Sequence, residues 1–236
     1  MKTIQHLLTI LVLVAATQAT AALESAKLDP NSVMPQFPLP MQVAGITRGT
    51  LVVATSIGVE GKITDTLVLG YTHESLVRPT IEVMKEWKFT PARLDGEPVP
   101  VQIVLTFEFT LEGAVITTNV INHFFFDHFA RMGDGAFVYR VYSSSEIDRV
   151  PALINAVKPK YAVEAEKQGI RGKVQVDFYI DENGNVRMPA INAAAHPYLT
   201  DQAVAAVREW KFTPPTHSGQ PVLVAASQEF DFSEGK

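Results

Sequence analysis

The chain has 236 residues, of which 47% are hydrophobic and 19% charged, and its formal net charge is −5. This composition is typical of a globular protein and excludes both a disordered chain and a protein with many membrane spans. The negative balance, with no cluster of Lys and Arg, argues against a nucleic-acid partner, and the lack of cysteine excludes disulfides and thiolate metal sites.

Residues 1–22 have the pattern of a secretory signal peptide. Lys2 supplies a positive start, an apolar run follows from Leu7 to Ala16, and Ala19-Thr20-Ala21 is a small-x-small exit. We therefore expect residues 1–21 to be removed and the folded part to lie outside the cytoplasm. The alternative is a retained anchor, because residues 4–22 are just long enough to span a bilayer.

The rest of the chain contains one domain twice, at a constant offset of 123 residues. Both tryptophans, Trp87 and Trp210, lie in the same phrase, Glu-Trp-Lys-Phe-Thr-Pro. The same offset relates Arg48-Gly49 to Arg171-Gly172, Gly61 to Gly184, His73 to His196, Gly96-x-Pro98 to Gly219-x-Pro221 and Phe107-x-Phe109 to Phe230-x-Phe232. A repeat of this length predicts two domains in tandem, over residues 30–110 and 152–236.

In the first copy, Pro38 and Pro40 limit the opening helix, because proline is excluded from a helix interior. Two strands joined by a turn at Gly61 follow, and the alternation of the first is blurred by Thr55 and Ser56. A second helix then leads to Trp87, and a third strand covers residues 101–109.

The connector, residues 111–151, has no counterpart in the repeat. It contains the aromatic run His123 to Phe129, a turn at Gly133-Asp-Gly135, and residues 137–142, which have strand composition. Because it is too apolar for a solvated linker, we expect it to pack on a neighbouring domain.

The second copy has clearer signals. A short helix over residues 162–168 is closed by Gly169, and the next strand, residues 173–180, alternates apolar and polar side chains. A hairpin turn at residues 181–184 leads to a strand over residues 186–194. The second helix, capped by Thr200 or Asp201, runs to about Trp210, and a third strand covers residues 222–232.

The order helix, strand, strand, helix, strand predicts an α+β fold with both helices on one face of a three-stranded sheet. Right-handed crossover places the first strand between the second and the third, so each third strand lies at an edge. An edge strand has unpaired backbone groups that can accept a peptide as an added strand. The candidate peptide-binding residues are therefore Val101, Ile103, Val104, Leu105 and Phe107 in the first copy, and Val222, Val224, Ala226, Gln228 and Phe230 in the second. The alternative is that residues 137–142 or the other copy cover these edges.

Other candidate sites are better explained by structure. The two tryptophans end amphipathic helices and are expected in the core, and His73 and His196 are expected at helix entries. Asp181-x-Asn183-x-Asn185 lacks the glycine and the final glutamate of a calcium loop, which favours a hairpin. For the group His123, Asp127 and His128, the intervening aromatic residues favour packing over metal binding. Since no nucleophile, phosphate loop or metalloprotease motif occurs either, we expect no enzyme activity, no metal and no cofactor.

The second copy resembles the C-terminal domain of the TonB family. The resemblance rests on Pro159-x-Tyr161, Gly169-Ile170-x-Gly172, Val174-x-Val176-x-Phe178, Ile180-Asp181-x-x-Gly184 and Leu199-x-x-x-Ala203-x-x-Ala206-Val207-x-x-Trp210-x-Phe212-x-Pro214. Residues 158–232 carry it well, and residues 35–109 carry it more weakly.

This resemblance implies a periplasmic interaction module that binds an envelope protein or peptide, such as a segment of a TonB-dependent outer-membrane transporter, by strand addition. Two alternatives remain open. One is a membrane-anchored energy transducer. The other is a structural envelope protein, in which the sheet edges are satisfied internally or in a homodimer.

Overall fold

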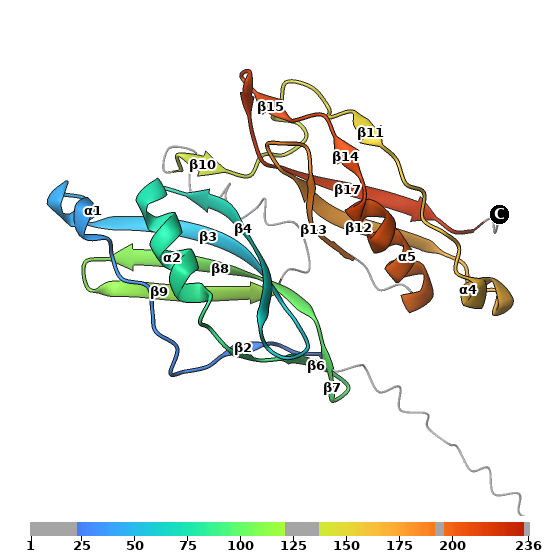
Figure 1. Ribbon diagram of the computed structural model, residues 1–236, viewed down its shortest axis with the longest axis horizontal. Coiled ribbons are helices and arrows are strands. Elements are labelled where there is room, and N and C mark those ends of the chain that lie inside the picture. Colours follow the sequence, from blue (N-terminus) through green and yellow to red (C-terminus); the bar gives the residue numbers. More distant parts are fainter. Residues whose placement is uncertain (1–22, 121–136, 192–195, 234–236) are drawn as a thin grey trace, which may run out of the picture.

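The computed structural model describes residues 23–120, 137–191 and 196–233 of the chain. It contains two α+β units, each with a short helix, two antiparallel strands, a longer helix and a returning strand. In Figure 1, α2 lies across the sheet of the first unit and α5 across the sheet of the second.

The first sheet has five strands where the sequence predicts three. Every neighbouring pair is antiparallel. The order is β10 (Tyr139–Arg140), β4 (Ile63–Tyr71), β3 (Arg48–Ile57), β8 (Val101–Thr110) and β9 (Gly113–Val120). Both additional strands, β9 and β10, come from the connector.

Three short helical segments cover one face of this sheet: α1 (Leu39–Val43), the 3-10 turn η1 (Glu74–Leu76) and α2 (Val77–Met84). Pro38 is the N-cap of α1 and Pro40 lies in its first turn, where a missing N–H costs nothing. The core beneath includes Met41, Leu76, Met84, Trp87 and Phe107, all almost completely buried.

The second sheet has the order β13 (Val186–Ile191), β12 (Lys173–Ile180) and β17 (Val224–Asp231), again antiparallel throughout. Helices α4 (Val163–Lys167) and α5 (Pro197–Arg208) pack against this sheet. The side chains of Leu199, Ala203 and Val207 on α5 pack with Val176 and Phe178 of β12 in a single core.

Helix α5 begins earlier than its sequence suggests. Its N-cap is His196, whose Nδ1 accepts a hydrogen bond from the backbone N–H of Tyr198 at 3.3 Å. Pro197 occupies the first helical position, which its fixed φ angle suits. The expected caps Thr200 and Asp201 are therefore wrong, because both lie inside the helix, and the expected helix-entry role of His196 is confirmed.

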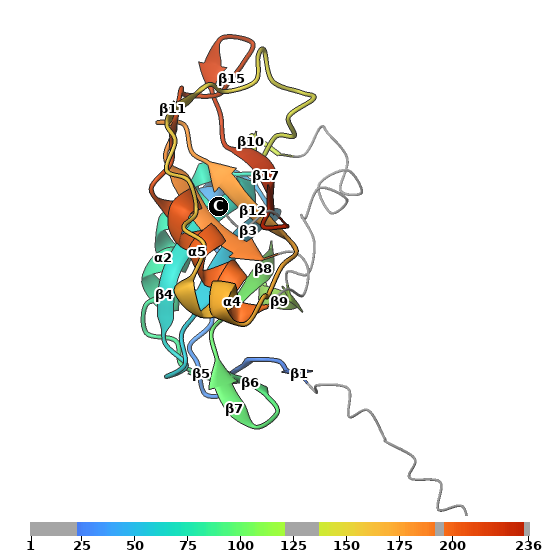
Figure 2. The same cartoon turned by 90° about the vertical axis from the view of Figure 1, so that its right-hand side faces the viewer.

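The remaining strands are short, and each pairs within its own unit. They are β1 (Leu23–Glu24) with β6 (Ala92–Leu94) and β7 (Glu97–Val99), β2 (Lys27–Leu28) with β5 (Phe89–Thr90), β11 (Leu153–Asn155) with β14 (Lys211–Phe212), and β15 (Thr216–His217) with β16 (Gln220–Pro221). The hairpins β6–β7 and β15–β16 lie at opposite ends of the molecule (Figure 2).

The tryptophans make the same contact in both units. The indole N–H of Trp87 donates to the carbonyl of Val33 at 2.8 Å, and that of Trp210 donates to the carbonyl of Val157 at 2.7 Å. Trp87 is 3% exposed and Trp210 is 9% exposed, so the prediction that both belong to the core is confirmed. Each indole ties the entry segment of its unit to the end of the second helix.

The geometry of the hairpin turns also explains why glycine recurs at positions 61 and 184. Gly61 and Gly184 have φ angles of +75° and +79°, and their carbonyls accept hydrogen bonds from the N–H groups of Phe89 and Phe212, both at 2.9 Å. A Cβ on Gly61 would lie 1.9 Å from the carbonyl oxygen of Phe89, and one on Gly184 would lie 2.0 Å from that of Phe212. Only glycine allows the hairpin turn to approach the Trp-Lys-Phe segment this closely.

The two units contact each other through the faces of their sheets that carry no helix. Val52 and Ala54 of β3 share a buried cluster with Tyr179 of β12 and with Leu223 and Ala225. At the margin of this cluster, the Arg187 guanidinium lies 2.9 Å from the Asp65 carboxylate of the other unit and also donates to the carbonyl of Thr66. Each unit therefore buries part of the helix-free face of its sheet against the other unit.

The connector spans this contact. Val141 is 3% exposed, and Phe137 and Tyr139 pack against the same cluster. For residues 137–142, the expected packing on neighbouring domains is confirmed. The aromatic run from His123 to Phe129 and the turn at Gly133 lie outside the described residues.

Candidate functional site

The outer edge of β17 is the strongest candidate site. Beside its first residues, Tyr142 of the connector donates its N–H to the carbonyl of Leu223 at 2.9 Å and accepts from the N–H of Ala225 at 3.0 Å. Because backbone groups alternate along a strand, those of Ser227, Glu229 and Asp231 also point away from β12. Within the described residues, the outward N–H groups of these three have no hydrogen-bond partner.

Two pockets lie beside this edge, and Trp210 lines both. The pocket near the end of β17 has a volume of about 310 Å³. It is lined by Ala156, Val157, Lys158, Pro159, Tyr161, Trp210, Phe230, Asp231 and Phe232. The second, near the beginning of β17, has a volume of about 550 Å³ and includes Phe178, Ile180, Phe212, Val224 and Ala226 in its wall.

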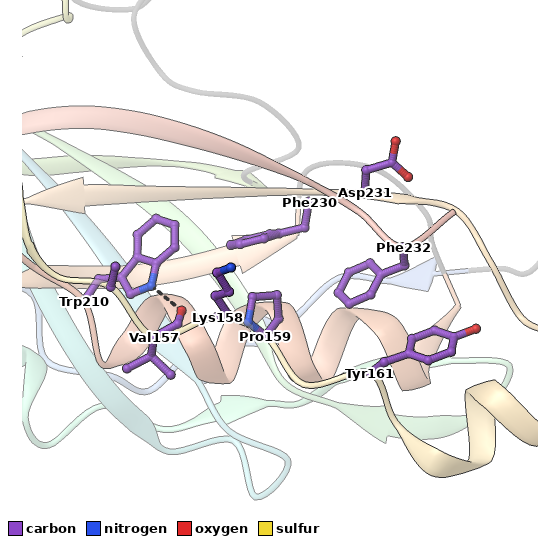
Figure 3. Close-up of a pocket in the computed structure, with 9 residues that line it drawn as sticks. Val157, Lys158, Pro159, Tyr161, Trp210, Phe230, Asp231 and Phe232 are labelled. Carbon is purple, nitrogen blue, oxygen red and sulfur yellow. Dashed lines mark hydrogen bonds between the residues drawn. The ribbon is translucent and has the colours of Figure 1, made fainter. Parts of the chain in front are cut away.

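The first pocket is walled by aromatic rings. Phe230 of β17 and Phe232, which directly follows the strand, extend toward the segment that carries Pro159 and Tyr161, while the carboxylate of Asp231 points away from the rings (Figure 3). Tyr161 stacks on Phe232 with ring centroids 6.2 Å apart. An apolar side chain of a strand added at this edge would meet these rings, and its backbone would meet the open N–H groups.

The opposite face of β17 is polar. The Lys173 ammonium lies 2.8 Å from the Glu229 carboxylate, and the Gln175 side-chain amide donates to the Ser227 hydroxyl at 2.9 Å. The hydrogen bond to Glu229 raises the pKa of Lys173, whereas hydrogen bonds from the Ser233 hydroxyl and N–H lower the pKa of Asp231. An added strand would thus have one apolar and one polar side.

The corresponding edge of the first copy is not open. Strand β8 lies between β3 and β9 and pairs along its length with both. The expectation that Val101, Ile103, Val104, Leu105 and Phe107 form an edge is therefore wrong, because the connector returns in a hairpin and takes the position beside them.

In the second copy, the five predicted residues have different positions. Val222 precedes β17, is buried, and donates its N–H to the carbonyl of Pro215. Val224 lies in β17, but Tyr142 already bridges it. The remaining three, Ala226, Gln228 and Phe230, lie on β17 and point their side chains to the face of the pockets, while their backbone groups bond to β12.

The alternation of inward and outward backbone N–H groups also decides where a strand tolerates proline. The edge assignment implied that a proline at Val104 or Val224 would leave the core intact. The structure contradicts this, because Val104 is completely buried in the middle of a sheet and the N–H of Val224 faces β12. The N–H groups that proline could remove without breaking the sheet are those of Ser227 and Glu229.

The other sequence candidates have structural roles. The Asp181 carboxylate accepts the N–H groups of Asn183 and Asn185 at 3.0 and 2.8 Å, which confirms the hairpin between β12 and β13. His73 precedes η1, and its Nδ1 lies 2.9 Å from the Thr72 hydroxyl. Across the described part of the chain, no group of three His, Asp or Glu residues is arranged to hold a metal ion. The candidates His123, Asp127 and His128 lie outside it.

Strongly shifted acids cluster where the connector meets both units. A hydrogen bond from Arg140, reinforced by the N–H and hydroxyl of Ser143, lowers the pKa of Glu146 to about 2. Burial raises the pKa of Tyr139, whose hydroxyl donates to Glu182 at 2.5 Å. These groups bond to one another and fix the connector. Of these residues, Ser143 also lines the pocket of about 550 Å³.

Sequence reasoning missed strand β9, whereas the alternative that residues 137–142 cover an edge is confirmed in part, because Tyr142 bridges the beginning of β17. The run Ala114-Val-Ile-Thr-Thr118 is rich in β-branched residues and is a usable strand signal. This run has no counterpart in the second copy, because the repeated unit ends at β8 in the first copy and at β17 in the second.

Comparison with known families identifies the repeated unit. The model of the Gram-negative bacterial TonB protein C-terminal family matches residues 35–111 and again residues 157–233, which together are more than half of the chain. The chain belongs to the TonB C-terminal family. Its two TonB C-terminal regions form the two α+β units described above.

A curated relative supports the same assignment. Protein TonB of Vibrio cholerae serotype O1 (strain ATCC 39315 / El Tor Inaba N16961) is 35% identical to this chain over 74 residues. The match covers 30% of this chain and 30% of that protein, so it concerns less than one third of the relative's length. Among the described residues, none of the helices is both long and apolar enough to cross a bilayer.

Proposed function

We propose that this protein is an exported, periplasm-facing interaction module without enzymatic activity, which binds an extended peptide of an envelope protein along the outer edge of β17. A segment of a TonB-dependent outer-membrane transporter is the partner class that the family membership favours. The observation that carries the proposal is the set of outward N–H groups at Ser227, Glu229 and Asp231, beside two apolar pockets.

The edge has the properties that strand addition requires. Backbone hydrogen bonds supply affinity, and pockets for alternate side chains supply selectivity. Ala226 and Phe230 face the pocket side, and the polar pairs of Ser227 and Glu229 lie on the other side. Tyr142 occupies the first position of the edge, so a ligand strand pairs from about Ser227 onward.

A proline at Ser227 tests the proposal. Ser227→Pro removes one outward N–H and leaves the ladder with β12 intact, because proline is tolerated where the N–H faces solvent. Ser227→Ala is the matched control, since it removes the hydroxyl that contacts Gln175 and keeps the N–H. Capture of the partner from envelope extract is expected to fall by about tenfold or more for Ser227→Pro and to stay unchanged for Ser227→Ala.

Hydrogen exchange provides an independent measurement. In the free protein, the amides of Ser227 and Glu229 should exchange fast, and the bound partner should protect them. Equal capture by Ser227→Pro and the parent protein, with both retaining the same circular dichroism spectrum, would show that the partner binds elsewhere.

A further inference from the structure

The first copy already has a strand at the position that is open in the second. Strand β9 pairs with β8 from Gly113 opposite Thr110 onward, and this pairing places Ala114 opposite Phe109 and Ile116 opposite Phe107. Side chains of directly opposite residues lie on the same face of a sheet. Ala114 and Ile116 accordingly pack against the core of the first unit.

The repeat identifies the counterparts of these contacts. At the constant offset, Phe107 corresponds to Phe230 and Phe109 to Phe232. Phe107 and Phe109 are 0% and 1% exposed beneath β9. Phe230 is only half-buried, and with Phe232 it lines the pocket of about 310 Å³ (Figure 3). The pocket therefore lies where a strand placed as β9 is would insert its apolar side chains.

We infer that β9 is the chain's own counterpart of the ligand, and that the peptide bound by β17 carries the same pattern. This rests on the proposed function. The ligand has a β-branched aliphatic residue facing Phe230 and a small residue two positions away facing Phe232, as Ile116 and Ala114 are placed in β9. Because side chains alternate whichever way a strand runs, the pattern holds for either direction of the peptide.

The inference also assigns different roles to the two copies. In the first, β8 is paired on both sides by the chain itself, so a peptide cannot add to β8, and the sheet ends at β9 instead. Only the second copy binds, and the first acts as its support through the buried contact between the two sheets.

The test uses the full chain and a fluorescein-labelled synthetic peptide with the sequence of Gly113–Val120. Fluorescence anisotropy gives its dissociation constant. In this peptide, Ile116→Asp places a carboxylate against the aromatic pocket, whereas the matched control Thr117→Asp places it on the opposite face, because Thr117 pairs with Thr106. We expect Ile116→Asp to weaken binding by about tenfold or more and Thr117→Asp to change it by less than about threefold.

The Ser227→Pro protein separates the possible outcomes. Binding of the parent peptide that is lost with Ser227→Pro and with Ile116→Asp supports the inference. Equal loss with both aspartate peptides, or no binding of the parent peptide while envelope capture remains sensitive to Ser227→Pro, would overturn the ligand pattern and leave the proposed function standing.

Two further results would also overturn the inference. Peptide binding unchanged by Ser227→Pro would place the peptide away from β17. Peptide affinity that falls as the protein concentration rises, with a dimer in size-exclusion chromatography, would assign the edge to a second copy of this chain.

Discussion

Alanine at Gly184 should destabilise the second unit far more than its small size suggests. Gly184 has a φ angle of +79°, and an added Cβ would lie 2.0 Å from the carbonyl oxygen of Phe212. The backbone conformation alone costs about 1–2 kcal/mol for an L-residue. To relieve the contact, the hairpin must also move away from Phe212, which breaks the hydrogen bond between the Phe212 N–H and the Gly184 carbonyl and costs about 1 kcal/mol more.

The expected decrease in the free energy of unfolding is therefore about 3 kcal/mol. Gly219→Ala is the matched control, because Gly219 has a φ angle of +75° and no atom within 4 Å of the added Cβ. Its expected cost is only the conformational part, about 1–2 kcal/mol. Urea denaturation followed by tryptophan fluorescence measures both, and equal losses for the two variants would refute the role of the close approach to Phe212.

Three further predictions concern the contact between the units and the connector. Leu223→Ala, at a completely buried position between the sheets, should lower the free energy of unfolding of the full chain by about 2–4 kcal/mol in urea titrations. Arg187→Ala, which breaks a half-exposed ion pair with Asp65, should cost less than about 1 kcal/mol in the same titrations, and a larger loss would show that this pair holds the units together. The pKa of Glu146 is lowered from 4.5 to about 2, so its contribution is complete above pH 4.5 and is lost as the pH falls toward 2. Glu146→Gln should therefore flatten the decline of the urea midpoint between these pH values, and a parallel decline in parent and variant would exclude Arg140 as an effective partner.

The blurred alternation of β3 shows where sequence reasoning stops. The alternation is blurred by Thr55 and Ser56, and the run Leu51-Val-Val-Ala54 before them has no polar side. In the structure, Leu51 and Val53 face the helices while Val52 and Ala54 face the other unit. A strand buried on both faces is continuously apolar. The sequence contained this information, but only the packing of the two units explains it.

Strand β12 alternates more clearly because only one of its faces is buried along most of its length. Val174, Val176 and Phe178 face the helices, and on the opposite face Lys173 and Gln175 remain accessible while Tyr179 alone is buried against the other unit. Local periodicity was thus sufficient where one face meets water. The position of β9 could not be predicted in this way, because strand order depends on contacts between distant segments and the repeat offered no second example.

The hairpin of β8 and β9 also bears on how the chain avoids self-association while it folds. Only Leu111 and Glu112 separate these two strands, so they can pair within microseconds, long before β17 can find β12 more than 40 residues away. Unpaired edges of incompletely folded domains invite aggregation. Pairing with β9 therefore covers β8 early in folding, whereas β17 still presents an edge in the folded chain.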